Sequence, residues 1–213
     1  LCSGKKGKVN SILFFVFSSL LVMMGLFLLK ADSVVSWMKE NIHSYAIQRF
    51  IGYQDPFGHV ATSGKQLVNS YVAISNGGIF GLGIGNGIQK RGYLPEPYTD
   101  FVLSVTAEEL GFIGILVILI ALATLIIRII VIGAKENELY YRLICYGTAT
   151  LFFTQSFLNI GAVCGLVPIT GVTLPFVSYG GSSVWILSVC LGFVLMISAK
   201  QKDRRRQKDL EIM

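Results

Sequence analysis

The carboxylate of Asp100 stands where it could act on a substrate at a membrane surface. It ends a stiff acidic segment, Leu94-Pro95-Glu96-Pro97-Tyr98-Thr99-Asp100, and a long apolar stretch follows. A carboxylate at the mouth of a membrane span is costly to keep unless it has a use. We interpret Asp100 as a candidate general base that deprotonates a hydroxyl. Asp is also favoured as the N-cap of a following helix, and both roles can hold together.

Two further acids, Glu108 and Glu109, lie in the first turns of the apolar stretch. Adjacent carboxylates in a span cannot both face lipid cheaply, so at least one should point into a helix bundle. They could lock neighbouring helices through hydrogen bonds, or they could bind or gate a substrate.

Basic residues upstream of Asp100 could balance the charge of a phosphate leaving group. Lys90 and Arg91 are nearest in sequence, and Lys65 is a more distant candidate. A solvated basic turn is the alternative for this pair. Between them and Lys65 runs GGIFGLGIGNG, residues 77–87, which contains G-x-G-x-G but follows no strand. Nucleotide binding is therefore a poor interpretation, and we expect tight turns and close backbone approach to a partner or ligand.

The composition is that of a polytopic membrane protein, because 53% of the residues are apolar and only 14% are charged. Soluble domains have about 25% charged residues. The net charge of +6 does not indicate nucleic acid, since the basic residues cluster at span ends and in the tail. The four cysteines form no CxxC pair and have no neighbouring histidine, so neither a disulfide framework nor a zinc site is expected.

Hydropathy predicts an all-α polytopic membrane protein, a single membrane domain over residues 1–213 with four transmembrane helices. The predicted spans are residues 9–29, 101–127, 143–164 and 182–199. The positive-inside rule puts both ends and the tail 200–213 in the cytoplasm and the long loop 31–100 outside. Within that loop, 34–50 is either an interfacial amphipathic helix or a continuation of the first span, and 65–75 is expected to be helical. A non-helical hairpin over 165–181 needs shielding by protein or by a wet cavity.

Three strings in this order resemble the SEDS family of bacterial cell-wall proteins. They are Gly77–Gly83, Leu94–Phe101 with Glu108–Gly111, and Asn159–Ser183. Residues 89–96 are most similar to the division branch of that family. The resemblance implies a bundle of ten membrane helices, of which this chain would supply the last four. The sequence starts at Leu1 without a signal peptide, and we expect it to be a fragment that is inactive alone.

The resemblance also implies an activity, the polymerisation of lipid II into glycan strands at the outer face of the bacterial cytoplasmic membrane during cell division. The family's essential aspartate falls on Asp100 and its Pro-Glu on Pro95 and Glu96. Many members have histidine before Thr-Asp, where this chain has Tyr98. Substrate contacts are expected from six side chains: Lys65, Lys90, Arg91, Glu96, Glu108 and Glu109.

The expected partners are lipid II and nascent glycan, a class B penicillin-binding protein transpeptidase, other divisome membrane proteins and the lipid bilayer. No cofactor is required by the residues; a divalent cation (Mg or Mn) is an alternative to Lys90 and Arg91 as the counter-charge, although no metal site is fixed by spacing. Two other functions stay open. One is a flippase for the same lipid precursor, because polar residues inside spans would suit a translocation path: Glu108, Glu109, Gln155 and Asn159. The other is a non-catalytic scaffold of the division machinery.

Overall fold

The computed structural model describes residues 45–60 and 62–212, and the chain divides into two compact units, Leu1–Ile51 and Gly52–Met213. Helix α3 (Tyr45–Gln54) starts in the first unit. The predicted span 9–29 and most of the predicted helix 34–50 lie outside the described residues. Those two expectations therefore stay predictions.

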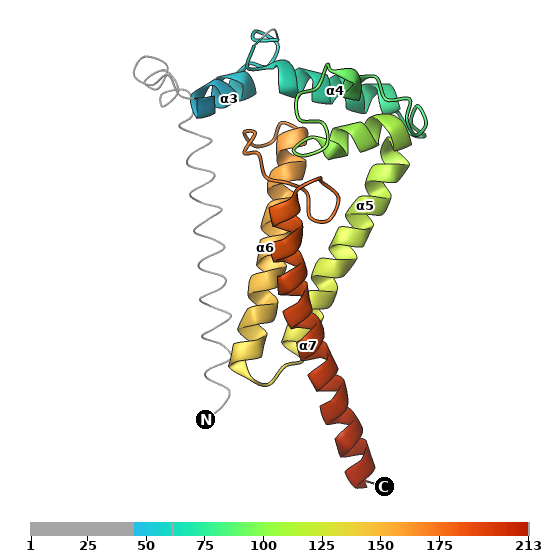
Figure 1. Cartoon of the computed structure of the whole chain (residues 1–213), viewed down its shortest axis with the longest axis vertical. Coiled ribbons are helices and arrows are strands. Elements are labelled where there is room, and N and C mark those ends of the chain that lie inside the picture. Colours follow the sequence, from blue (N-terminus) through green and yellow to red (C-terminus); the bar gives the residue numbers. More distant parts are fainter. Residues whose placement is uncertain (1–44, 61, 213) are drawn as a thin grey trace. The chain divides into compact units, whose positions relative to one another are not determined.

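The second unit is built from helices joined by loops, which confirms the all-α class for the described residues. Its elements are α4 (Lys65–Gly77), the 3-10 helix η1 (Gln89–Arg91), α5 (Val102–Ala134), α6 (Leu139–Val163) and α7 (Gly181–Ile212). Among the residues that the structure describes, two stretches are long and apolar enough to cross a membrane, α5 and residues Gly181–Arg204 of α7. Helix α7 continues without a break through the basic tail (Figure 1). The total number of spans stays a prediction.

Two apolar clusters hold the second unit together. Helix α4 lies across one end of α5 and α6 (Figure 1), and the first cluster fills that junction. Its fully buried members include Leu67 of α4, Phe101 and Leu103 at the start of α5, and Leu174 of the hairpin. The second cluster lies along α5, α6 and α7 and comprises Ile129, Cys145, Ala149, Phe152, Leu187, Val194 and Ile197.

Helix α5 is broken near its start, where the sequence predicts one uninterrupted span. Gly111 has φ 67° and ψ −164°, which are not helical angles. The segment Val102–Leu110 lies beside α4, and the chain then turns into the long part of α5 (Figure 1). A left-handed φ of this kind is accessible to glycine at little cost and is unfavourable for other residues.

A loop of residues 78–83, here called the splice loop, supplies the hydrogen bonds that this break removes. The N–H groups of Leu82 and Gly83 donate to the carbonyls of Glu108 and Glu109, each at 2.9 Å. On the other side of Gly111, the N–H of Phe112 donates to Gly78 at 2.9 Å and that of Ile113 donates to Ile79 at 3.3 Å. Unpaired backbone groups at membrane depth cost several kcal/mol each, so these bonds make the break tolerable.

The glycine run is explained by this crossing. A Cβ atom on Gly77 would overlap the carbonyl of Ala107, and one on Gly81 would overlap the carbonyl of Glu109. Gly81 also has φ 77°, in the left-handed region. The close backbone approach that the sequence predicts is thus made to α5 of the same chain.

Candidate active site at the start of α5

The segment that carries Asp100 is anchored at both ends by buried side chains. Leu94 is 2% exposed before it, and Phe101 is 1% exposed after it. Pro95 and Pro97 fix two of the intervening φ angles. Asp100 itself is half-buried and lies directly before Phe101 and the first turn of α5. This short rigid segment, residues 94–101 and here called the strap, therefore determines where the main chain of Asp100 lies.

Glu96 adopts a strained backbone conformation between the two prolines, with φ 51°. A left-handed conformation costs a non-glycine residue roughly 1–2 kcal/mol. The hydroxyl of Thr99 closes the turn by donating to the Glu96 carbonyl at 3.4 Å and to its carboxylate at 3.2 Å. Such strain persists only where the surrounding structure enforces it, and it gathers at functional sites.

Asn159 of α6 joins this strap to the hairpin between α6 and α7. Its side-chain amide donates to the main-chain carbonyl of Asp100 at 2.9 Å and to that of Val172 at 2.7 Å. Asn159 is 2% exposed, and its Oδ1 has no hydrogen-bond partner among the described residues. A second link runs from the N–H of Tyr179 to the carbonyl of Tyr98 at 2.8 Å. These bonds hold the Asp100 segment and the hairpin next to each other, although the two are far apart in the sequence.

A buried pair of hydroxyls ties helices α4, α5 and α6 together. Ser70 of α4 donates to the carbonyl of Val163 on α6 at 3.0 Å, and its oxygen lies 2.7 Å from that of Ser104 on α5. Both serines are fully buried. Because a buried polar group is costly when unpaired, this arrangement fixes how α4, α5 and α6 meet.

Glu108 and Glu109 hold the loop that follows the glycine run. Glu108 is 0% exposed; it accepts from the N–H of Gln89 at 3.0 Å and from the Asn76 amide at 3.3 Å. Glu109 forms an ion pair with Lys90. Both acids therefore bind η1 and its neighbours, which corresponds to the hydrogen-bonding role that the sequence left open.

Five of the predicted site residues form two groups, and the other two have exposed side chains. Glu96 and Asp100 share the strap, whereas Lys90, Glu108 and Glu109 form a separate cluster around η1. The side chains of Lys65 and Arg91 are exposed and form no ion pair with any residue that the structure describes. Substrate contact by these residues stays a prediction.

Sequence reasoning did not foresee the positioning role of Asn159 or the pairing of Ser70 with Ser104. The available signal was weak, because a lone amide or hydroxyl in an apolar helix does not say what it binds. Within residues 45–60 and 62–212, no three His, Cys, Asp or Glu side chains come together as a metal site. What the arrangement offers chemically is the Asp100 carboxylate on a main chain that Asn159 braces.

Known proteins are similar to this chain over most of its length. Residues 7–203 match the FtsW/RodA/SpoVE family, described as "Cell cycle protein". The chain is 40% identical over 212 residues to the "Probable peptidoglycan glycosyltransferase FtsW" of Bacillus subtilis (strain 168), with 98% of this chain and 51% of the relative aligned. The protein of the same name in Lactococcus lactis is 47% identical over 161 residues, 76% of this chain and 38% of the relative. The chain thus spans about half the length of the curated relatives it matches.

A solved structure agrees with the sequence matches. A chain of a peptidoglycan synthase complex, described as showing "structural coordination of polymerization and crosslinking", superposes with a TM-score of 0.56 at 31% identity. The match covers 83% of this chain and 47% of that one. The predicted family is confirmed: this chain belongs to the FtsW/RodA/SpoVE (SEDS) family and is most like FtsW.

Proposed function

We propose that the protein is a peptidoglycan glycosyltransferase that polymerises lipid II into glycan strands at the outer face of the cytoplasmic membrane. The names of its FtsW relatives and its similarity to a chain of a peptidoglycan synthase complex support this reaction class. The observation that carries the proposal is the pair of hydrogen bonds from Asn159 to the main-chain carbonyls of Asp100 and Val172, because they brace the main chain of Asp100 directly before α5.

In the proposed reaction, Asp100 is the general base. It removes the proton from the acceptor GlcNAc hydroxyl as that oxygen bonds to the anomeric carbon of a MurNAc unit. The bond from this carbon to the lipid diphosphate breaks, and the diphosphate leaves with its electron pair. A positioned carboxylate in this role contributes a factor of about 10² to 10⁴ in rate.

We assign the counter-charge for the leaving diphosphate to Arg91 and Lys65, whose side chains are exposed. Lys90 is given a supporting role, since it is already paired with Glu109. Glu96 is proposed to contact the sugar from the strap. In the proposed reaction the counter-charge comes from these basic side chains.

The proposed partners follow from the same family membership. We propose that the enzyme acts in cell division beside a class B penicillin-binding protein, whose transpeptidase activity would cross-link the new strand. Its setting is the bacterial cytoplasmic membrane, with the Asp100 strap on the outer side and both chain ends in the cytoplasm.

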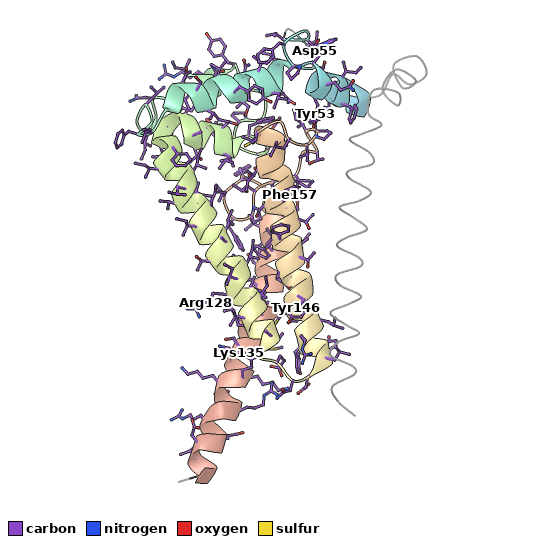
Figure 2. The ribbon with its side chains drawn as sticks, turned by 180° about the vertical axis from the view of Figure 1, so that it is seen from behind. Tyr53, Asp55, Arg128, Lys135, Tyr146 and Phe157 are labelled. Carbon is purple, nitrogen blue, oxygen red and sulfur yellow. The ribbon has the colours of Figure 1, made fainter. Side chains whose placement is uncertain are left out.

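The test is glycan polymerisation from purified lipid II by the full-length protein in detergent, with its transpeptidase partner present. We expect wild type to make polymer and Asp100→Asn to lose it by roughly 10² or more. Asp55→Asn is the matched control, because this acid also lies in the long loop but only caps the N–H of Gly58 at 2.9 Å (Figure 2).

Three results would contradict the proposal. Polymer from Asp100→Asn at the wild-type rate would remove Asp100 as the base. Failure of the wild-type protein to make polymer, with lipid II translocation intact in vesicles, would favour the flippase instead. Failure of both assays with intact recruitment of the transpeptidase would favour the scaffold.

A further inference from the structure

A basic pocket lies between the C-terminal end of α5 and the middle of α7. It has a volume of about 380 Å³ and is lined by Arg128, Val131, Ile132, Lys135, Ser198, Gln201 and Lys202. The lining follows helical spacing on both walls, because the α5 residues are three, four and seven positions apart and the α7 residues three and four. Figure 2 shows Arg128 in the half of α5 that is farther from α4, and Lys135 just after the last residue of α5.

The three cations of the pocket have no acidic partner in the part of the chain that the structure describes. Neither Arg128, Lys135 nor Lys202 forms an ion pair there. Arg128 lies on the helix Val102–Ala134, directly after the predicted span 101–127 and roughly 10 Å along the helix from Lys135. A cation at the end of a span lies within reach of anionic lipid headgroups.

The carboxylate of Glu136, which follows Lys135 in the sequence, does not cancel this charge. The carboxylate of Glu136 is 1% exposed and is held by Arg204 at 2.7 Å and by Gln201 at 2.8 Å. Gln201 also donates to the carbonyl of Ile132 at 2.9 Å, so its amide links α5 and α7 within the lining of the pocket. Burial by itself would raise the pKa of Glu136, but the hydrogen bonds from Gln201 and Arg204 outweigh it and lower that pKa. The Glu136 carboxylate is thus already paired with Arg204 and Gln201 and does not neutralise the cations of the pocket.

We propose that this pocket binds the phosphate headgroup of an anionic phospholipid. The cations of both walls meet the phosphate, the Ser198 hydroxyl offers a further donor, and Val131 and Ile132 continue as an apolar wall for the acyl chains. Basic pockets between membrane helices suit such headgroups. The site lies apart from Asp100 and does not depend on the proposed reaction.

The experiment measures lipid binding to the purified full-length protein in a neutral detergent, by native mass spectrometry with added phosphatidylglycerol. Phosphatidylcholine is the zwitterionic comparison, and inorganic phosphate is the soluble competitor. We expect preferential retention of phosphatidylglycerol. The variant Lys135→Gln/Lys202→Gln, with one charge removed from each wall, should bind it roughly 25-fold more weakly.

The matched control is Lys200→Gln/Arg206→Gln, which removes the same charge from α7 outside the pocket and should keep wild-type affinity. Equal loss in both double variants, or no loss in either, would overturn the proposal. Displacement of the lipid by inorganic phosphate at equal concentration would assign the site to a free anion instead. If the pocket double variant fails to fold, Arg128→Gln alone should lower affinity roughly fivefold, and an unchanged value would overturn the proposal equally.

Discussion

The side-chain amide of Asn159 donates to the main-chain carbonyl of Asp100 at 2.9 Å, across 59 positions of sequence. The bond fixes the backbone of the proposed base without touching its carboxylate. Asn159 is therefore a positioning residue, and its second bond, to Val172, fixes the hairpin at the same point.

Asn159→Leu should lower the rate of polymerisation about 100-fold, because a misplacement of about 1 Å is enough for such a loss. The pH at which the rate is half-maximal should stay at its wild-type value, since the carboxylate is still present. The matched control is Gln155→Leu, one turn earlier on α6, whose side chain makes no hydrogen bond to the strap or the hairpin. Equal rates in the two variants would remove Asn159 from the positioning role.

The splice across Gly111 gives a prediction about stability. Gly81→Ala should destabilise the protein by roughly 2–5 kcal/mol, because it combines an unfavourable positive φ with an overlap on the Glu109 carbonyl. Gly85→Ala is the control. Its φ is 89°, but a Cβ atom there meets nothing within 4 Å, so only the strain of about 1–2 kcal/mol should appear. Thermal unfolding in detergent measures both, and indistinguishable midpoints would argue against the close crossing.

The pair of Lys90 and Glu109 separates a structural role from a substrate role. Lys90→Glu and Glu109→Lys should each destabilise the protein, by roughly 1–3 kcal/mol, since the side chains are only 21% and 14% exposed. The double reversal should recover at least half of that loss together with polymerisation. Arg91→Gln, by contrast, should lower polymerisation and leave the unfolding midpoint unchanged. Recovery of stability without activity in the reversal would return Lys90 to the substrate contacts.

The pH dependence of stability should report on Glu136. Its pKa is lowered in the folded protein, so its contribution is complete above the unfolded value of about 4.3 and is lost as pH falls through the folded value. Glu136→Gln should therefore lower the unfolding midpoint at pH 7, and the gap to wild type should close progressively below about pH 4.

Glu138→Gln is the control for that measurement, because this acid is 52% exposed and its nearest cations are 3.8 Å away. Its effect should stay within about 0.5 kcal/mol at every pH. A gap for Glu136→Gln that widens on acidification would contradict the inferred direction of the pKa shift.

Local patterns of the sequence predict the helices well, and long-range bonds explain what they miss. The apolar stretches 101–127, 143–164 and 182–199 correspond to α5, α6 and α7, since hydropathy and charge are properties of each stretch alone. The break at Gly111 was not predictable in this way, because it exists only where the splice loop supplies the missing partners. The helical continuation of α7 through the tail was missed for the opposite reason, as charge density ends a span but not a helix.

In the candidate site, too, local features were predictable from the sequence and long-range contacts were not. The prolines and the acid of the strap mark Asp100 from the sequence alone. The pairing of Lys90 with Glu109 and the burial of Glu108 needed the fold, because the residues that meet there are 19 positions apart. Motif resemblance supplied the family, and geometry supplied the reason for the amide at position 159.

The spliced start of α5 also limits how this region can move. The short segment Val102–Leu110 cannot swivel about its own axis while four backbone bonds join the chain on both sides of Gly111 to the splice loop. A conformational change that re-aims the Asp100 carboxylate during turnover must carry the glycine loop with it as one rigid body, or else unzip those bonds one by one.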